Sequence, residues 1–242
     1  MALAKAVLES QLNSRFGDVF KLAERRFTEI LPTGVSEIDL LSGGLPRGAI
    51  TEIFGPASSG RTSLMLSAVA RATRQEEACA VIDTHNTFDP KSASKAGADL
   101  DQLLWLRCDN QLEHAFKAAD MILQSGGFSL VVLDLGDLPA SQARKIISSW
   151  WYRFRRVIEN KPTALLVIAQ DACVRSCASL SFAINIVEDN WTTATTVPAS
   201  RQQPLGPRLL QGIKLHTERH RPILPGIRAV TFQAQLHLQA NY

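Results

Sequence analysis

The nine residues GPASSGRTS, Gly55 to Ser63, decide the fold of this 242-residue chain. They follow the apolar run AITEIF, residues 49–54, and precede the helical pattern of residues 63–73. A strand that passes through a glycine loop into a helix aims backbone N–H groups and the helix N-terminus at anionic oxygens. We therefore predict a phosphate-binding loop whose nucleotide contacts are Gly55, Pro56, Ser58, Ser59, Gly60, Arg61, Thr62 and Ser63.

One residue departs from the usual loop pattern G-x-x-x-x-G-K-[ST], because Arg61 stands in place of the lysine. A lysine ammonium is compact and lies against the outer phosphates, whereas a guanidinium is wider and planar. We expect weaker nucleotide binding and no efficient hydrolysis. The loop would then be either a structural remnant or a weak nucleotide sensor.

Strand and helix patterns alternate through the rest of the chain, and the strands are continuous apolar runs. This arrangement is typical of a parallel sheet with helices on both faces, so we predict a doubly wound α/β core. Near the C-terminus, GIKLHTERH and GIRAVTFQAQLHL flank a Pro225-Gly226 turn and predict an antiparallel hairpin. We expect this hairpin to dock on the sheet edge, because an isolated two-stranded unit is barely stable.

The charge and the apolar pattern divide the chain into three parts. We expect an amphipathic, protomer-docking N-terminal segment at 1–30, the phosphate-loop core at 31–197, and a linker with a basic hairpin at 198–242. The formal net charge is +3, yet the residues from 190 onward include six Lys or Arg and one acid. A basic tail suits nucleic acid or an acidic partner, or is a solvated surface extension.

Localisation follows from the same composition. There is no run of about 18 apolar residues, so no membrane span is expected. The N-terminus is polar too early for a secretory leader, and we expect a cytoplasmic protein. The four cysteines are expected to be reduced and packed.

Two polar residues end neighbouring apolar strands. Asp134 closes LVVLD and is placed to hold Mg²⁺ through water beside the phosphate loop, together with Thr62. The alternative for Asp134 is a helix cap or a loop residue. Gln170 closes ALLVIAQ, a position from which a polar side chain could sense a terminal phosphate.

The order and spacing of these motifs resemble the bacterial recombinase family RecA over roughly residues 1–190. The resemblance rests on LPTGVSEIDLLSGGLPRGAITEIFGPASSGRTSL, ACAVIDTHNTFDP, SGGFSLVVLDL and TALLVIAQ. It implies a RecA-like P-loop core that uses ATP and Mg²⁺. It also implies that the N-terminal helix docks on a neighbouring protomer.

The departures from RecA are equally specific. The family's catalytic glutamate falls on His85, and loss of a general base typically costs ~10² to 10⁴ in rate. Asp89 matches the family's adenine-contacting acid, but the stacking aromatic falls on Ser92. The two DNA-binding loops that follow Asp134 and Gln170 are nearly absent, so strand exchange is not expected.

A shortened core of this kind resembles ImuA, the accessory protein family of the ImuA-ImuB mutagenesis cassette. The resemblance lies in LLWLRC, SGGFSLVVLD and VRSCASL. It implies an adaptor in SOS-linked, mutagenic translesion DNA synthesis, with RecA and an ImuB-like polymerase-related protein as partners. The alternatives are a DNA-stimulated ATPase, in which His85 or a partner's residue supplies the base, and a degenerate paralogue that caps or remodels RecA filaments.

A helix predicted at residues 141–158 combines aromatic and basic side chains. Ile147, Trp151, Phe154 and Ile158 share one face and should be buried. Tyr152, Arg153 and Arg156 project away from it, which suits single-stranded DNA or a partner. The alternative is that both tryptophans of this helix are core and the arginines only solvate the surface.

Overall fold

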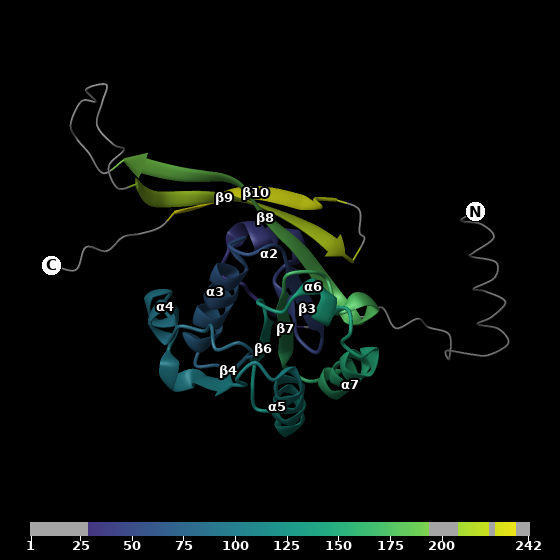
Figure 1. The fold of residues 1–242 in the computed structure, drawn as a ribbon. Helices are drawn as coiled ribbons and strands as arrows, with labels where there is room; N and C mark the ends of the chain where they lie inside the picture. Colours follow the sequence, from purple (N-terminus) through teal and green to yellow (C-terminus); the bar gives the residue numbers. More distant parts are fainter. Residues whose placement is uncertain (1–28, 194–207, 223–225, 236–242) are drawn as a thin grey trace, which may run out of the picture.

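The computed structural model describes residues 29–193, 208–222 and 226–235. In that part of the chain an eight-stranded sheet has the order β10-β9-β8-β3-β7-β6-β4-β5. The predicted N-terminal helix lies outside the described residues, as do most of the predicted linker and the end of the second hairpin strand. Figure 1 shows β9, β10 and the second part of β8 above α2, whereas the first part of β8 runs down into the rest of the sheet.

Six strands form the parallel half of the sheet. They are β3 (Ile50–Phe54), β4 (Cys79–Asp83), β5 (Leu103–Arg107), β6 (Leu130–Leu135), β7 (Ala164–Ala169) and the first part of β8 (Ala178–Thr193). Strands β4, β6 and β7 are buried along their whole length, as continuous apolar runs predict. The short strands β1 (Ile30–Leu31) and β2 (Leu45–Pro46) pair separately.

Helices cover both faces of the sheet. One core includes residues of α2 (Ser36–Ser42), α3 (Arg61–Thr73) and α4 (Pro90–Lys95), and the other includes residues of α5 (Leu112–Ser125), α6 (Ala140–Ala143) and α7 (Ser148–Ile158). Two 3₁₀ turns, η2 (Leu100–Gln102) and η3 (Arg175–Cys177), complete the described elements. The predicted doubly wound α/β fold is confirmed.

The C-terminal hairpin is present and adds to the same sheet. Strand β9 (Arg208–Arg221) runs antiparallel to β8, and β10 (Ala229–Gln235) runs antiparallel to β9. Leu215 of β9 belongs to the core that includes α3, and the His220 ring meets the Phe54 ring edge-on, with centroids 5.2 Å apart. The hairpin therefore supports the strand that leads into the phosphate loop.

The single helix predicted at 141–158 is wrong in one respect. The chain forms α6, a break, and then α7, with Ile147 extended at φ −69° and ψ 125° just before α7. Ile146 enters the core, so Ile147 is turned outward and is 66% exposed instead of buried. Trp151, Phe154 and Ile158 are buried as predicted.

Candidate nucleotide site

The phosphate loop has its expected place between β3 and α3. Gly60 caps α3 in the left-handed region at φ +91°, and Ser59 N–H donates to the Pro56 carbonyl over 3.2 Å. Gly55 N–H donates to the Gln170 carbonyl over 3.1 Å, which ties the loop to the end of β7. Backbone hydrogen bonds thus set the shape of the loop.

Close packing explains both glycines. A Cβ atom added at Gly55 would lie 2.1 Å from the Ile184 carbonyl oxygen of β8. At Gly60 the positive φ already favours glycine, and a Cβ would lie 3.0 Å from a Leu215 methyl group. Residues of β8 and β9 therefore pack directly against Gly55 and Gly60 of the loop.

Anion donors come from the start of α3. The first N–H groups of a helix lack intrahelical acceptors, and Thr62 and Ser63 are exposed in that first turn. The first turn carries no acidic residue. The Ser59 hydroxyl is 1% exposed and has no hydrogen-bond partner within the described residues. These groups together could hold the phosphates of a nucleotide.

Arg61 points away from the loop. Its side chain is 7% exposed, and Nη1 donates to the Gly136 carbonyl over 3.3 Å, in the turn that follows β6. Burial lowers the pKa of the guanidinium, while the charges of Asp134 and Asp137 raise it. The arginine thus joins α3 to the end of β6 across the end of β7.

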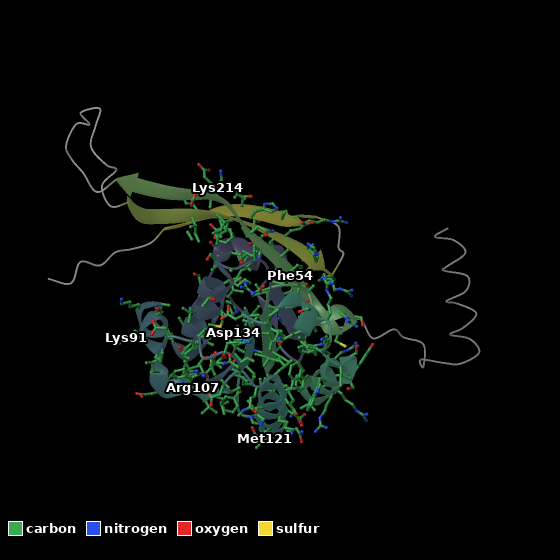
Figure 2. All side chains as sticks on the ribbon, viewed as in Figure 1. Phe54, Lys91, Arg107, Met121, Asp134 and Lys214 are labelled. Atoms are coloured by element: carbon green, nitrogen blue, oxygen red, sulfur yellow. The ribbon has the colours of Figure 1, made fainter. Side chains whose placement is uncertain are left out.

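Asp134 lies in the interior of the parallel half, as Figure 2 shows. Its Oδ1 accepts a 2.8 Å hydrogen bond from the Gly136 N–H, and it pairs in register with Asp83 of β4. Burial raises the pKa of Asp134 to about 6, against the opposing effects of the Gly136 hydrogen bond and Arg61. The charges of Asp83 and Asp137 add to this rise in pKa, and the charge of Arg61 is the smallest of the effects.

The RecA resemblance implies a Mg²⁺ ion beside the loop, with Thr62 and Asp134 as the residues that would hold it. Thr62 is exposed at the start of α3, but Asp134 faces the Arg61 guanidinium. Elsewhere in the described ranges, no group of three or more His, Cys, Asp or Glu side chains could hold a metal ion. The residues present do not fit a divalent cation at this place.

The other predicted nucleotide residues are spread along the strand ends. His85 is half-buried in the turn after β4, which is separated from β3 by β6 and β7. Asp89 caps α4, and its carboxylate accepts from Lys91 N–H, Ser92 N–H and the Ser92 hydroxyl. The Ser92 hydrogen bond is the main cause of a lowered Asp89 pKa. Gln170 follows β7 directly, beside Gly55.

The three residues predicted as a nucleic-acid or partner surface have different environments. Tyr152 is 55% exposed, and Arg156 is exposed. Arg153 is engaged: Nε donates to Asp120 Oδ1 of α5 over 2.6 Å, and Nη2 donates to Oδ2. Its guanidinium also lies 6.0 Å from the Trp150 ring centre. Arg153 therefore joins α7 to α5, whereas Tyr152 and Arg156 remain available for a ligand.

Two buried acidic residues that organise the site were missed in the sequence. Glu52 is buried in β3 and accepts from the Cys173 and Val174 N–H groups over 2.6 and 2.8 Å. Asp83 accepts from the Thr87 and Phe88 N–H groups and from the Trp105 indole. A charged residue within or at the end of an apolar strand was the available signal for both.

The state of the cysteines and the length of the helices were also predicted from the sequence. All four cysteines are free and buried, as expected, and burial is the main cause of the raised pKa of about 12 for Cys79. No helix among the described residues is long and apolar enough to cross a membrane.

Comparison with known proteins assigns the family. The RecA N-terminal domain family matches residues 2–143. Protein RecA of Cutibacterium acnes is 40% identical over 137 residues, covering 55% of this chain and 39% of that protein. Protein RecA of Streptomyces avermitilis is 40% identical over 131 residues (52% and 34%), and that of Leifsonia xyli subsp. xyli is 43% identical over 131 (52% and 36%). The matched region thus spans less than half the length of these relatives. With its strand, loop and helix in the matching order, the chain belongs to the RecA family.

Proposed function

We propose that this protein is a RecA-like accessory factor of the DNA damage response, an adaptor in mutagenic translesion synthesis that hydrolyses nucleotide inefficiently and performs no strand exchange. The observation that carries the proposal is the position of Arg61, which contacts Gly136 and faces Asp134. The side chain that stands in place of the loop lysine thus makes a hydrogen bond within the protein. The half-buried His85 stands where the family has its catalytic acid.

Short, anchored connections support the absence of strand exchange. Only residues 136–139 link β6 to α6, and residues 170–177 link β7 to β8. Glu52 binds the backbone of the second connection, and Arg175 Nη2 donates to the Arg144 carbonyl over 3.3 Å. Segments held in this way lack the length and freedom of the two mobile DNA-binding loops that the RecA resemblance implies.

An adaptor would bind its partners through exposed surfaces of the molecule. The candidates are the N-terminal segment at 1–30, the basic hairpin within 198–242, and the exposed Tyr152 and Arg156 of α7. The proposed partners are RecA and an ImuB-like polymerase-related protein in the bacterial cytoplasm, with single-stranded DNA as a further ligand of the α7 surface. An exposed aromatic ring beside an arginine suits base stacking and phosphate contact.

Two measurements test this proposal. Phosphate release, with and without single-stranded DNA and RecA, should stay at background, and substantial turnover would instead favour the DNA-stimulated ATPase. Co-purification with RecA and with the ImuB-like protein, each separately, should recover both complexes. Recovery of RecA alone would favour the paralogue that caps or remodels filaments.

A further inference from the structure

A group of exposed basic residues lies where α6, η3 and the start of α7 meet. Arg144 caps the C-terminus of α6, Lys145 follows it, and Arg175 begins η3; all three residues are exposed. The Arg175 guanidinium reaches α6, because its Nη2 donates to the Arg144 carbonyl over 3.3 Å. Together with the exposed Ile147, which precedes α7, these residues form the α6–η3 surface.

The α6–η3 surface is built from stretches whose charges have one sign. Residues 138–158 and 172–187, which contain α6, α7 and η3, include no Asp or Glu, and Asp137 and Asp171 precede the two stretches. Among the described residues, the three basic side chains of this surface form no ion pair with an acid. Their charges are therefore available to an acidic ligand.

The backbone of Arg175 is held in a costly conformation. Its φ is +57°, in the left-handed region, which a residue other than glycine adopts at an energetic cost. The turn before it is fixed by Glu52, a buried carboxylate of β3 that accepts from the Cys173 and Val174 N–H groups over 2.6 and 2.8 Å. The protein thus keeps an arginine in a defined place where a glycine would fit the backbone better.

The exposed apolar side chain beside these charges is aliphatic. Ile147 is 66% exposed and offers no ring for stacking on a nucleic-acid base, whereas it can pack against an apolar side chain of a peptide. Guanidinium groups pair with carboxylates through two parallel hydrogen bonds. We propose that the α6–η3 surface binds an acidic peptide segment that carries aliphatic side chains among its carboxylates.

The test is a fluorescence anisotropy titration of the full chain with three short labelled peptides. The first contains glutamates and leucines, the second has serine in place of each leucine, and the third has glutamine in place of each glutamate. The first peptide should bind at least about tenfold more tightly than either of the others, and its binding should weaken as salt is raised. Equal binding of the first and third peptides, or no measurable binding of the first, would overturn the proposal.

Charge-reversal variants locate the binding. Arg144→Glu and Arg175→Glu should each weaken binding of the first peptide about tenfold or more, since each replaces an attraction by a repulsion. Ile147→Ser should weaken binding of the first peptide and leave the second unchanged. The matched control is Lys91→Glu, the same change of charge at an exposed residue of α4, on the side of the molecule away from α6 and α7 (Figure 1). Folded Arg144→Glu and Arg175→Glu variants that bind like the wild type would contradict the assignment.

A glycine at residue 175 separates binding from stability. Glycine adopts a positive φ without strain, so Arg175→Gly should unfold in urea at a midpoint close to that of the wild type. Binding of the first peptide should nevertheless fall about tenfold, because the guanidinium is lost. A lower midpoint with unchanged peptide binding would show that Arg175 serves the fold alone.

Single-stranded DNA is the competing ligand for a basic surface. A labelled oligodeoxythymidylate that binds the wild type, loses binding in Arg175→Glu and displaces the first peptide would assign the surface to nucleic acid and overturn the proposal. The inference goes beyond the adaptor role and its test uses neither RecA nor the ImuB-like protein. Failed peptide binding therefore leaves that role standing, and failed co-purification leaves the peptide result unchanged.

Discussion

The phosphate loop after β3 and the end of β6 with the turn that follows it, residues 134–137, lie at the same edge of the sheet but differ in how they are built. The loop depends on backbone geometry, with glycines packed against β8 and β9 and the N-terminus of α3 behind them. The turn depends on side-chain charge, with Asp134 facing Arg61. The loop is therefore held by main-chain geometry, whereas the turn depends on which side chains reach it from other elements.

The largest expected effect is at Gly55, where the backbone of the loop is most confined. In Gly55→Ala the new methyl group would lie 2.1 Å from the Ile184 carbonyl oxygen, and neither backbone can move easily. We expect a loss of about 3 kcal/mol in the free energy of unfolding, measured with urea. Gly126→Ala is the control, since no atom lies within 4 Å of its Cβ position and only its positive φ costs ~1 kcal/mol. Equal losses in the two variants would contradict the packing argument.

The next effect concerns Asp134 and the pH dependence of the free energy of unfolding. The pKa of Asp134 is raised from 3.8 to about 6 in the folded protein, so its contribution to stability is complete below pH 3.8 and is lost as the pH rises through about 6. Asp134→Asn removes this dependence. The variant should gain on the order of 2 kcal/mol relative to wild type between pH ~4 and pH ~7.

Urea unfolding of wild type and Asp134→Asn across this pH range checks the prediction. Asp101→Asn, at an exposed position, is the control and should follow the wild-type curve. Parallel curves for wild type and Asp134→Asn would show that Asp134 titrates normally.

A smaller effect is expected at Gly136, which joins the two charges of the turn. A methyl group in Gly136→Ala would lie 2.9 Å from Asp134 Oδ1 and force the carboxylate to shift. We expect a loss of about 1 kcal/mol. In a double-mutant cycle with Arg61→Lys the loss should shrink, because the guanidinium no longer constrains the turn. If the two losses of unfolding free energy were strictly additive, Gly136 and Arg61 would not be energetically coupled.

The smallest effect tests whether the α7 surface behaves as support or as a binding face. Arg153→Met breaks the pair with Asp120, and because Arg153 is half-exposed the expected loss is only about 0.5 kcal/mol. Arg156→Met should leave stability unchanged. If this surface binds single-stranded DNA, Arg156→Met should instead weaken salt-sensitive binding. A binding loss confined to Arg153→Met would reverse the roles assigned to the two arginines.

Strand and helix positions followed the sequence closely because the strands are buried on both sides. Strands β6 and β7 match the apolar runs LVVLD and ALLVIAQ. The long helix at 141–158 was the exception, because periodicity could not reveal that Ile146 enters the core and Ile147 turns outward. Helical spacing predicts which side chains share a face, but it does not detect a break that preserves the spacing on either side.

For the candidate site, the sequence by itself determined the glycine loop, its place between a strand and a helix, and the loss of the lysine at Arg61. These follow from local rules, since loop geometry depends on residues that are neighbours in the chain. Only the tertiary structure decided where the Arg61 side chain goes, that Asp134 accepts a hydrogen bond from the Gly136 N–H in a buried position, and that Arg153 is held by Asp120. The contacts of the two arginines each join residues more than 30 positions apart. The burial that gives such contacts their energy exists only after the sheet and its helices have packed.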